Sequence, residues 1–153
     1  MLSMRAKYGL KAVIRLAREQ ESQPMLISDL ASKERIPKKF LELILLDLKN
    51  IGILGSRKGR GGGYYLAKAP EAITLGTLVR HLNGPLALVP CVSQSAYQKC
   101  TDCEDERTCG IRIVMKEVHD ATVKILDGTT LADVVRQIDQ AVRAQSELLM
   151  YCI

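Results

Sequence analysis

The chain has 153 residues, of which 47% are hydrophobic and 25% are charged, and its formal net charge is +5. This composition is typical of a globular protein with a packed core and excludes an intrinsically disordered chain. No apolar run reaches the roughly 18 residues that a membrane-spanning helix needs, and the first residues lack the apolar stretch of a secretory signal. We therefore expect a cytoplasmic protein with no membrane partner.

The charge is distributed unevenly along the chain. Residues 1–80 hold 15 Lys and Arg against 7 Asp and Glu, a net charge of +8, whereas residues 81–153 hold 7 against 10, a net charge of −3. A basic first half and an acidic second half indicate that the first half meets a polyanion such as nucleic acid. Ordinary scatter of charged residues is the alternative explanation.

Three helices are predicted within the first 52 residues. Apolar residues at helical spacing predict the first over residues 4–20. A short second helix is expected to begin near Ser28, a good N-cap residue, and to end before Pro37, because proline disfavours the α conformation in the residue before it. Pro37 can occupy the first position of the third helix, which Gly52 would terminate. The third helix has an apolar stripe of Leu41, Ile44, Leu45 and Leu48.

A basic, glycine-rich segment follows at residues 57–66, which read Arg-Lys-Gly-Arg-Gly-Gly-Gly-Tyr-Tyr-Leu. Glycine permits positive φ and close backbone approach, so this segment predicts a sharp hairpin between strands at 53–54 and 64–66. Three cations in its first four residues would repel one another unless an anion lies against the tip. A Walker phosphate-binding loop needs a following Lys-Ser or Lys-Thr, which is absent here. A solvated charged loop is the other alternative.

Helix, short helix, helix and hairpin is the element order of a winged helix-turn-helix, whose third helix enters the major groove of DNA through its N-terminal residues. We therefore predict a mainly α fold with a small β-hairpin wing. Lysines at the start of that helix can reach phosphates or guanine edges, a glutamate can accept from a cytosine amine, and wing arginines can enter the minor groove. The predicted DNA-contacting residues are Lys38, Lys39, Glu42, Arg57, Lys58, Arg60 and Gly61.

The two lysines could also form an ordinary solvated helix start. Cations near a helix N-terminus oppose the helix dipole, however, which points to an external anion. Beyond the hairpin, Thr74 is expected to cap a fourth helix that stops at Gly84. A long helix with a near-heptad apolar stripe is predicted over 110–127, and a last helix runs from Thr130 through Val142.

The chain resembles the IscR/NsrR/CymR family of bacterial regulators, and the similarity is carried by residues 36–42, 52–67, 73–75, 83–85 and 126–133. The resemblance implies a homodimeric winged-helix transcription factor, often a repressor, that binds double-stranded DNA at a roughly palindromic operator. It also implies that the long helix crosses its partner in the dimer. We accordingly expect a DNA-binding domain over 1–84, a cysteine-rich sensor loop over 85–109, and dimerisation and C-terminal helices over 110–153.

Four of the five cysteines lie within 19 residues with the spacing C-x8-C-x2-C-x5-C: Cys91, Cys100, Cys103 and Cys109. Structural disulfides are not expected in a chain without an export signal, whereas a C-x2-C pair can bring two thiolates to one metal centre. The resemblance implies three cysteine ligands to an iron–sulfur cluster and a variable fourth. By position Cys103 and Cys109 match the last two of the three, while Arg112 stands where some members place a ligating histidine. Cys152 is treated as incidental.

Three chemistries remain open for these cysteines: a [2Fe–2S] or [4Fe–4S] cluster, a structural zinc ion, or a metal-free thiol switch. The surrounding carboxylates raise thiol pKa values and disfavour a bare thiolate, which favours metal binding. We expect a regulator that senses iron–sulfur, redox or nitric oxide status through a cluster on all four cysteines. A metal-free regulator that answers a small ligand, thiol oxidation or a partner protein is the alternative, and an iron–sulfur redox protein is the other class. No catalytic constellation is present, so we do not expect an enzyme.

Overall fold

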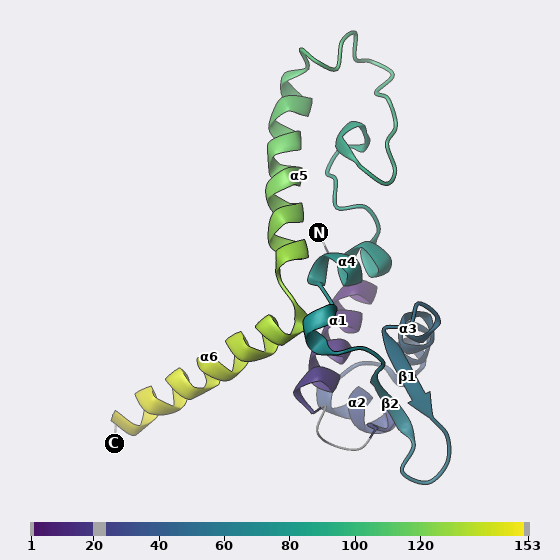
Figure 1. Ribbon diagram of the computed structural model, residues 1–153, viewed down its shortest axis with the longest axis vertical. Coiled ribbons are helices and arrows are strands. Elements are labelled where there is room, and N and C mark those ends of the chain that lie inside the picture. The colour runs from purple at the N-terminus through teal and green to yellow at the C-terminus, as the bar shows by residue number, and fades with distance from the viewer. Residues whose placement is uncertain (1, 20–23, 152–153) are drawn as a thin grey trace.

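The structure is a computed structural model that describes residues 2–19 and 24–151, and Cys152 lies outside them. One end is formed by four helices and a hairpin, which we call the head (Figure 1). Helix α5 rises from the head, and α6 leaves it at a wide angle (Figure 1). The elements are α1 Met4–Arg18, α2 Ile27–Glu34, α3 Lys38–Asn50, β1 Leu54–Arg57, β2 Gly63–Leu66, η1 Pro70–Ala72, α4 Leu75–Asn83, η2 Pro90–Val92, α5 Gly110–Gly128 and α6 Leu131–Tyr151.

The head has one apolar core, built from the buried faces of its helices. The predicted stripe of α3 is fully buried and packs on α1 and α2. Leu131, the first residue of α6, is also completely buried in this core, and Val135 packs against it. The start of α6 therefore belongs structurally to the head, while the rest of that helix extends away from it.

Helix boundaries in the head differ from the predicted ones at three places. Helix α1 ends at Arg18 rather than at residue 20, which lies outside the described residues. The predicted cap at Ser28 is wrong, because α2 begins at Ile27 and has no side-chain cap. The carbonyl of Leu26 accepts from the backbone N–H groups of Asp29 and Leu30. Pro37 was expected at the first helical position of α3, but it is the N-cap residue, and the helix begins at Lys38.

The wing comprises β1, β2 and the tip between them. The strands pair antiparallel from Leu54 opposite Leu66 to Arg57 opposite Gly63. The backbone of Met25 adds two hydrogen bonds of 2.8 and 2.9 Å to Tyr64. A Cβ atom at Gly63 would lie 2.2 Å from the carbonyl oxygen of Met25. Glycine at this position therefore lets the segment before α2 pair with the wing.

Helix α5 is attached to the head at its C-terminal end. The backbone N–H of Leu75 donates to Thr129 at 2.9 Å, and that of Leu131 donates to Ile73 at 2.8 Å. At the start of α6, the backbone N–H of Thr130 donates to the Asp133 carboxylate, and the backbone N–H of Asp133 donates to the Thr130 hydroxyl. Thr130 thus caps α6, close to the predicted start of this helix. Among the described residues, no helix is long and apolar enough to cross a membrane.

Candidate nucleic-acid interface and cysteine site

The first turns of α3 present the predicted contact residues to solvent. Lys38, Lys39 and Glu42 are exposed, on the side of the helix away from its buried stripe. The first turn holds no acidic residue that would offset the two lysines. Two cations at a helix N-terminus are unfavourable in isolation, because they oppose the partial positive charge of the helix dipole.

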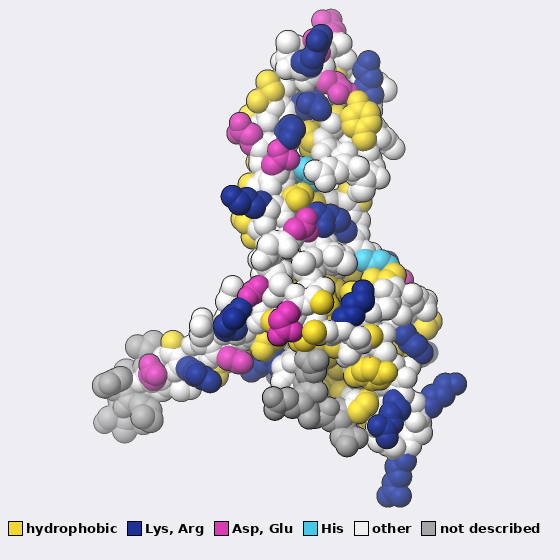
Figure 2. All heavy atoms as spheres, viewed as in Figure 1, with side chains coloured by type: hydrophobic (Ala, Val, Ile, Leu, Met, Phe, Trp, Pro, Cys, Tyr) yellow, Lys and Arg dark blue, Asp and Glu magenta, His cyan; other side chains and the backbone are white. Residues whose placement is uncertain are grey.

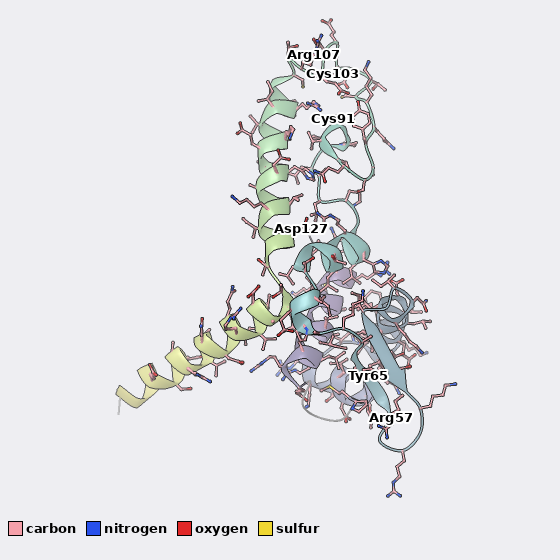
Figure 3. All side chains as sticks on the ribbon, viewed as in Figure 1. Arg57, Tyr65, Cys91, Cys103, Arg107 and Asp127 are labelled. Carbon is pink, nitrogen blue, oxygen red and sulfur yellow. The ribbon has the colours of Figure 1, made fainter. Side chains whose placement is uncertain are left out.

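The wing tip presents a second set of cations. Arg57, Lys58 and Arg60 are exposed. Basic side chains, drawn dark blue, project from the hairpin end of the molecule in Figure 2, and Figure 3 labels Arg57 there. Gly61, which was also predicted to contact DNA, has a φ of +73° that lets the chain turn beside Arg60. On the inner side of the wing, Lys49 of α3 donates to Ser56 of β1 at 2.8 Å. This hydrogen bond holds the wing next to α3.

Several other cations of the head are neutralised within the chain. Arg15 and Lys11 of α1 pair with Glu34, Arg18 pairs with Asp139, and Lys33 pairs with Glu19. In contrast, the five cations of the α3 start and the wing tip make no ion pair with any residue that the structure describes. Five cations without an ion pair among the described residues are therefore gathered on the start of α3 and the wing tip.

The four clustered cysteines line one cavity of about 430 Å³ at the far end of α5. Cys91 lies in η2, Cys109 is the N-cap residue of α5, and Cys100 and Cys103 lie on the irregular chain between them. This chain forms the loop at the end of the molecule opposite the wing (Figures 1 and 3). The fold thus brings together all four residues that the sequence spacing singled out.

The thiols differ in acidity. Hydrogen bonding from the backbone N–H of Arg112 lowers the pKa of Cys109, and a hydrogen bond from Cys103 lowers it further. Burial and that same hydrogen bond raise the pKa of Cys103. A hydrogen bond of 2.8 Å to Asp102 raises the pKa of Cys100. Cys109 is therefore the thiol that most readily ionises among these three.

The donor set suits a metal centre, but the thiols do not converge on one point. Among the described residues, no three His, Cys, Asp or Glu side chains are grouped closely enough to hold a metal ion. Cys103 and Cys109 shift each other's pKa, whereas Cys100 is exposed and donates to Asp102. Four thiols around one cavity fit a thiolate-ligated metal or cluster chemically, provided that Cys91 and Cys100 close on the other pair.

Three further side chains shape this cavity. Glu106 accepts from the Tyr97 hydroxyl at 2.6 Å, and its other oxygen lies 3.6 Å from Nε of Arg112. Arg112 lines the cavity in the first turn of α5, but an arginine supplies no metal ligand. The hydrogen bond of Tyr97 to Glu106 could not be predicted from the sequence, because the two residues are nine positions apart on an irregular segment.

The chain is similar to a family of regulators over most of its length. The Rrf2 family model, described as an iron-dependent transcriptional regulator, matches residues 2–137. An rrf2-like protein of Rhodobacter capsulatus is 44% identical over 138 residues, which cover 88% of this chain and 92% of that protein. The HTH-type transcriptional regulator CymR of Bacillus subtilis is 32% identical over 138 residues, covering 90% of this chain and 91% of CymR.

Solved structures share the fold. The structure of B. subtilis CymR, the global cysteine regulator, matches with a TM-score of 0.75 at 30% identity, over 90% of this chain and 97% of that one. T. potens IscR matches with a TM-score of 0.73 at 25% identity, over 92% and 90%. The predicted mainly α fold with a winged helix-turn-helix head is therefore confirmed.

Proposed function

Because the chain belongs to the Rrf2 family of transcriptional regulators, we propose that it binds operator DNA as a homodimer and that its cysteine segment, residues 85–109, controls this binding. One observation carries the DNA-binding part of the proposal. Most cations of α1 and Lys33 of α2 are paired with carboxylates, whereas those of the α3 start and the wing tip face solvent without such partners among the described residues. A polyanion would relieve the repulsion between them, and such a regulator would act in the cytoplasm.

In the proposed complex, α3 enters the major groove and the wing lies over the adjacent backbone. Lys38 and Lys39 bind phosphates or guanine edges, and Glu42 accepts from a cytosine amine. Arg60, at the tip of the wing, enters the flanking minor groove, where the negative potential is concentrated. Arg57 and Lys58 bind the backbone beside it.

The exposed apolar stripe of α5 supports a dimer. Ile111, Val114, Val118 and Ile125 are 68%, 53%, 41% and 65% exposed, respectively, in the single chain. A contiguous apolar stripe on a long exposed helix is typical of a protein–protein interface. Pairing of two α5 helices would bury this stripe and place two heads on a pseudo-palindromic site.

Control by the cysteine segment rests on its place in the fold. The segment ends at Cys109, and from there α5 runs without interruption to its attachment on the head. We propose that Cys91, Cys100, Cys103 and Cys109 hold an iron–sulfur cluster, which would supply sensitivity to redox state, nitric oxide or iron supply. A change in how these thiols are held would move the start of α5 and thereby the two heads.

A metal-free thiol switch is the second candidate, and a specific observation favours it. The pKa of Cys109 is lowered by the backbone N–H of Arg112 and by Cys103, and no three side chains among the described residues are grouped closely enough to hold a metal ion. Zinc would also fit four thiolates. Anaerobic purification followed by visible absorption and iron, sulfide and zinc analysis separates the three. A colourless protein with stoichiometric zinc, or with no metal, would rule out the cluster and leave the DNA-binding proposal standing.

The DNA-binding proposal is tested with Arg60→Ala. We expect this change to weaken binding to an operator selected from a random library and to lower the slope of log affinity against log salt by about one. Fluorescence anisotropy at two salt concentrations measures both quantities. Lys124→Ala, which removes an exposed cation of α5, is the matched control and should change neither. Equal affinity of Arg60→Ala and wild type at both salt concentrations would contradict the proposed role of the wing.

A further inference from the structure

The outward face of α3 carries two exposed leucines between its charged residues. Leu43 is 67% exposed and Leu46 is 50% exposed, although both belong to a helix whose other leucines are fully buried. An exposed leucine side chain is less favourable than a buried one, because its apolar surface stays in water. Two such residues one turn apart form an apolar patch at the centre of the proposed DNA-reading surface.

Their spacing places both leucines among the residues that face the groove. Lys39, Glu42, Leu43 and Leu46 fall at i, i+3, i+4 and i+7 on α3. Recognition helices that lie in the major groove present base-contacting residues at this spacing. The lysine and glutamate of this set were predicted from sequence to contact DNA, and the two leucines complete the same stripe.

The flanks of this stripe are already occupied by contacts within the head. On one side Asp47 accepts from Nε2 of His81 at 2.7 Å and is paired with Arg5. On the other side Lys49 donates to Ser56 of the wing. The two leucines lie between these contacts and remain open to solvent. Positive charge at the start of α3 and on the wing surrounds them, which identifies a polyanion as the occupant of this surface.

We infer that Leu43 and Leu46 are specificity-determining residues that contact thymine methyl groups in the major groove. This inference rests on the proposed function. The C5-methyl of thymine is the apolar group that B-DNA presents in this groove, and leucine side chains bury against it without a polar atom left unpaired. Where the lysines bind phosphates they supply affinity that does not depend on sequence, while the leucines favour operators with thymine under the second and third turns of α3.

The test removes single methyl groups from the DNA. Wild-type full-length protein selects its operator from a random duplex library, and each thymine of that operator is replaced in turn by deoxyuridine, which lacks only the methyl. We expect about a fourfold loss of affinity at one or two positions in each half-site, the value of one buried methyl-sized group. Leu43→Ala should bind the unmodified operator more weakly and lose the discrimination between thymine and deoxyuridine at one of these positions. Leu46→Ala should lose it at another.

The controls separate this inference from the proposed function. Leu43→Ala should fold normally, since the side chain is exposed and alanine is the best helix former. Leu88→Ala, which truncates a leucine of 66% exposure outside the head, should retain full discrimination. Wild-type protein that binds no duplex would overturn the proposed function and the inference together. Tight operator binding that ignores every thymine-to-deoxyuridine change, or that discriminates equally in both leucine variants, would overturn the inference alone and assign the leucines to another partner.

Discussion

At the level of single residues, the four clustered thiols have different surroundings although they line one cavity. Cys109 is stabilised as a thiolate by backbone N–H groups at the start of α5, whereas Cys100 is held as a thiol by its hydrogen bond to Asp102. Sequence spacing treats these residues as equivalent ligands. The difference arises from the helix N-terminus, which favours negative charge on Cys109 but not on the exposed cysteine nine residues earlier.

Alkylation of the reduced, metal-free chain tests this difference. At neutral pH we expect iodoacetamide to label Cys109 faster than Cys100, because the thiolate is the reactive form and the pKa is lowered at Cys109 but raised at Cys100. As the pH rises, labelling of Cys100 should increase more steeply, since more of its thiol remains to be ionised. Peptide mapping by mass spectrometry after brief labelling measures both rates. Faster labelling of Cys100 at neutral pH would contradict the assignment.

At the level of elements, one ion pair attaches α5 to α4. Arg80 donates to both oxygens of Asp127 at 2.6 and 2.8 Å, and Gly76 lies directly beneath the pair. A Cβ atom at Gly76 would lie 1.8 Å from Oδ1 of Asp127. Glycine inside a helix is ordinarily unfavourable relative to alanine by about 1 kcal/mol. At this position it allows the carboxylate to reach α4.

A double-mutant cycle measures this attachment. Asp127→Asn should lower stability by about 0.5 kcal/mol, a value discounted for the partial exposure of both side chains. Gly76→Ala should stabilise the protein by less than the higher helix propensity of alanine alone would give, because the new methyl group displaces the Asp127 carboxylate. In the Gly76→Ala background, Asp127→Asn should then cost almost nothing. Urea unfolding of the four variants measures the coupling, and additive effects would show that the close approach is unimportant.

The same pair predicts a pH dependence. The hydrogen bonds from Arg80 lower the pKa of Asp127 below its usual value. The stabilisation is therefore fully present above the usual aspartate pKa of about 3.9 and is lost as the pH falls through the lowered value of the folded state. The difference in stability between wild type and Asp127→Asn should accordingly be constant near neutral pH and shrink below about pH 4. If the stability difference between wild type and Asp127→Asn instead grew at acidic pH, the predicted direction of the Asp127 pKa shift would be wrong.

Whether the sequence predicts an element depends on whether the interactions that form it are local or join residues far apart in the chain. Apolar stripes and the signals at Pro37 and Gly52 are local, so α3 and its exposed lysines were predictable. The start of α2 was not, because the helix begins at Ile27 after Leu26, without the side-chain cap that Ser28 would have supplied. Contacts across the chain have no local signal either. The partners Arg80 and Asp127 are 47 residues apart, and the turn of Cys100 toward Asp102 depends on an irregular loop.

At the level of the whole molecule, α5 separates two functional ends. The wing lies at one end and the loop that carries the four clustered cysteines at the other, with α5 between them (Figure 1). The exposed apolar stripe lies along α5. A signal at the cysteines can reach the heads through α5, through residues 84–89 that join α4 to η2, or through packing of α5 against a second copy. This arrangement makes the dimer part of the proposed control and not merely a means of binding two half-sites.

Two charged residues in the stripe should therefore separate the copies without unfolding them. Val114 and Val118 are both exposed in the single chain, so Val114→Glu with Val118→Glu should leave the helical content unchanged. Sedimentation analysis should show a monomer, because burying two carboxylates without partners in the α5 pair is unfavourable. Operator affinity should fall at least about a hundredfold, since the two heads no longer bind as one unit. Lys124→Glu, which adds a carboxylate to an exposed position of α5 outside the stripe, should remain dimeric. A dimer that survives both glutamates would move the interface away from α5 and would require the cysteine signal to reach the heads by another route.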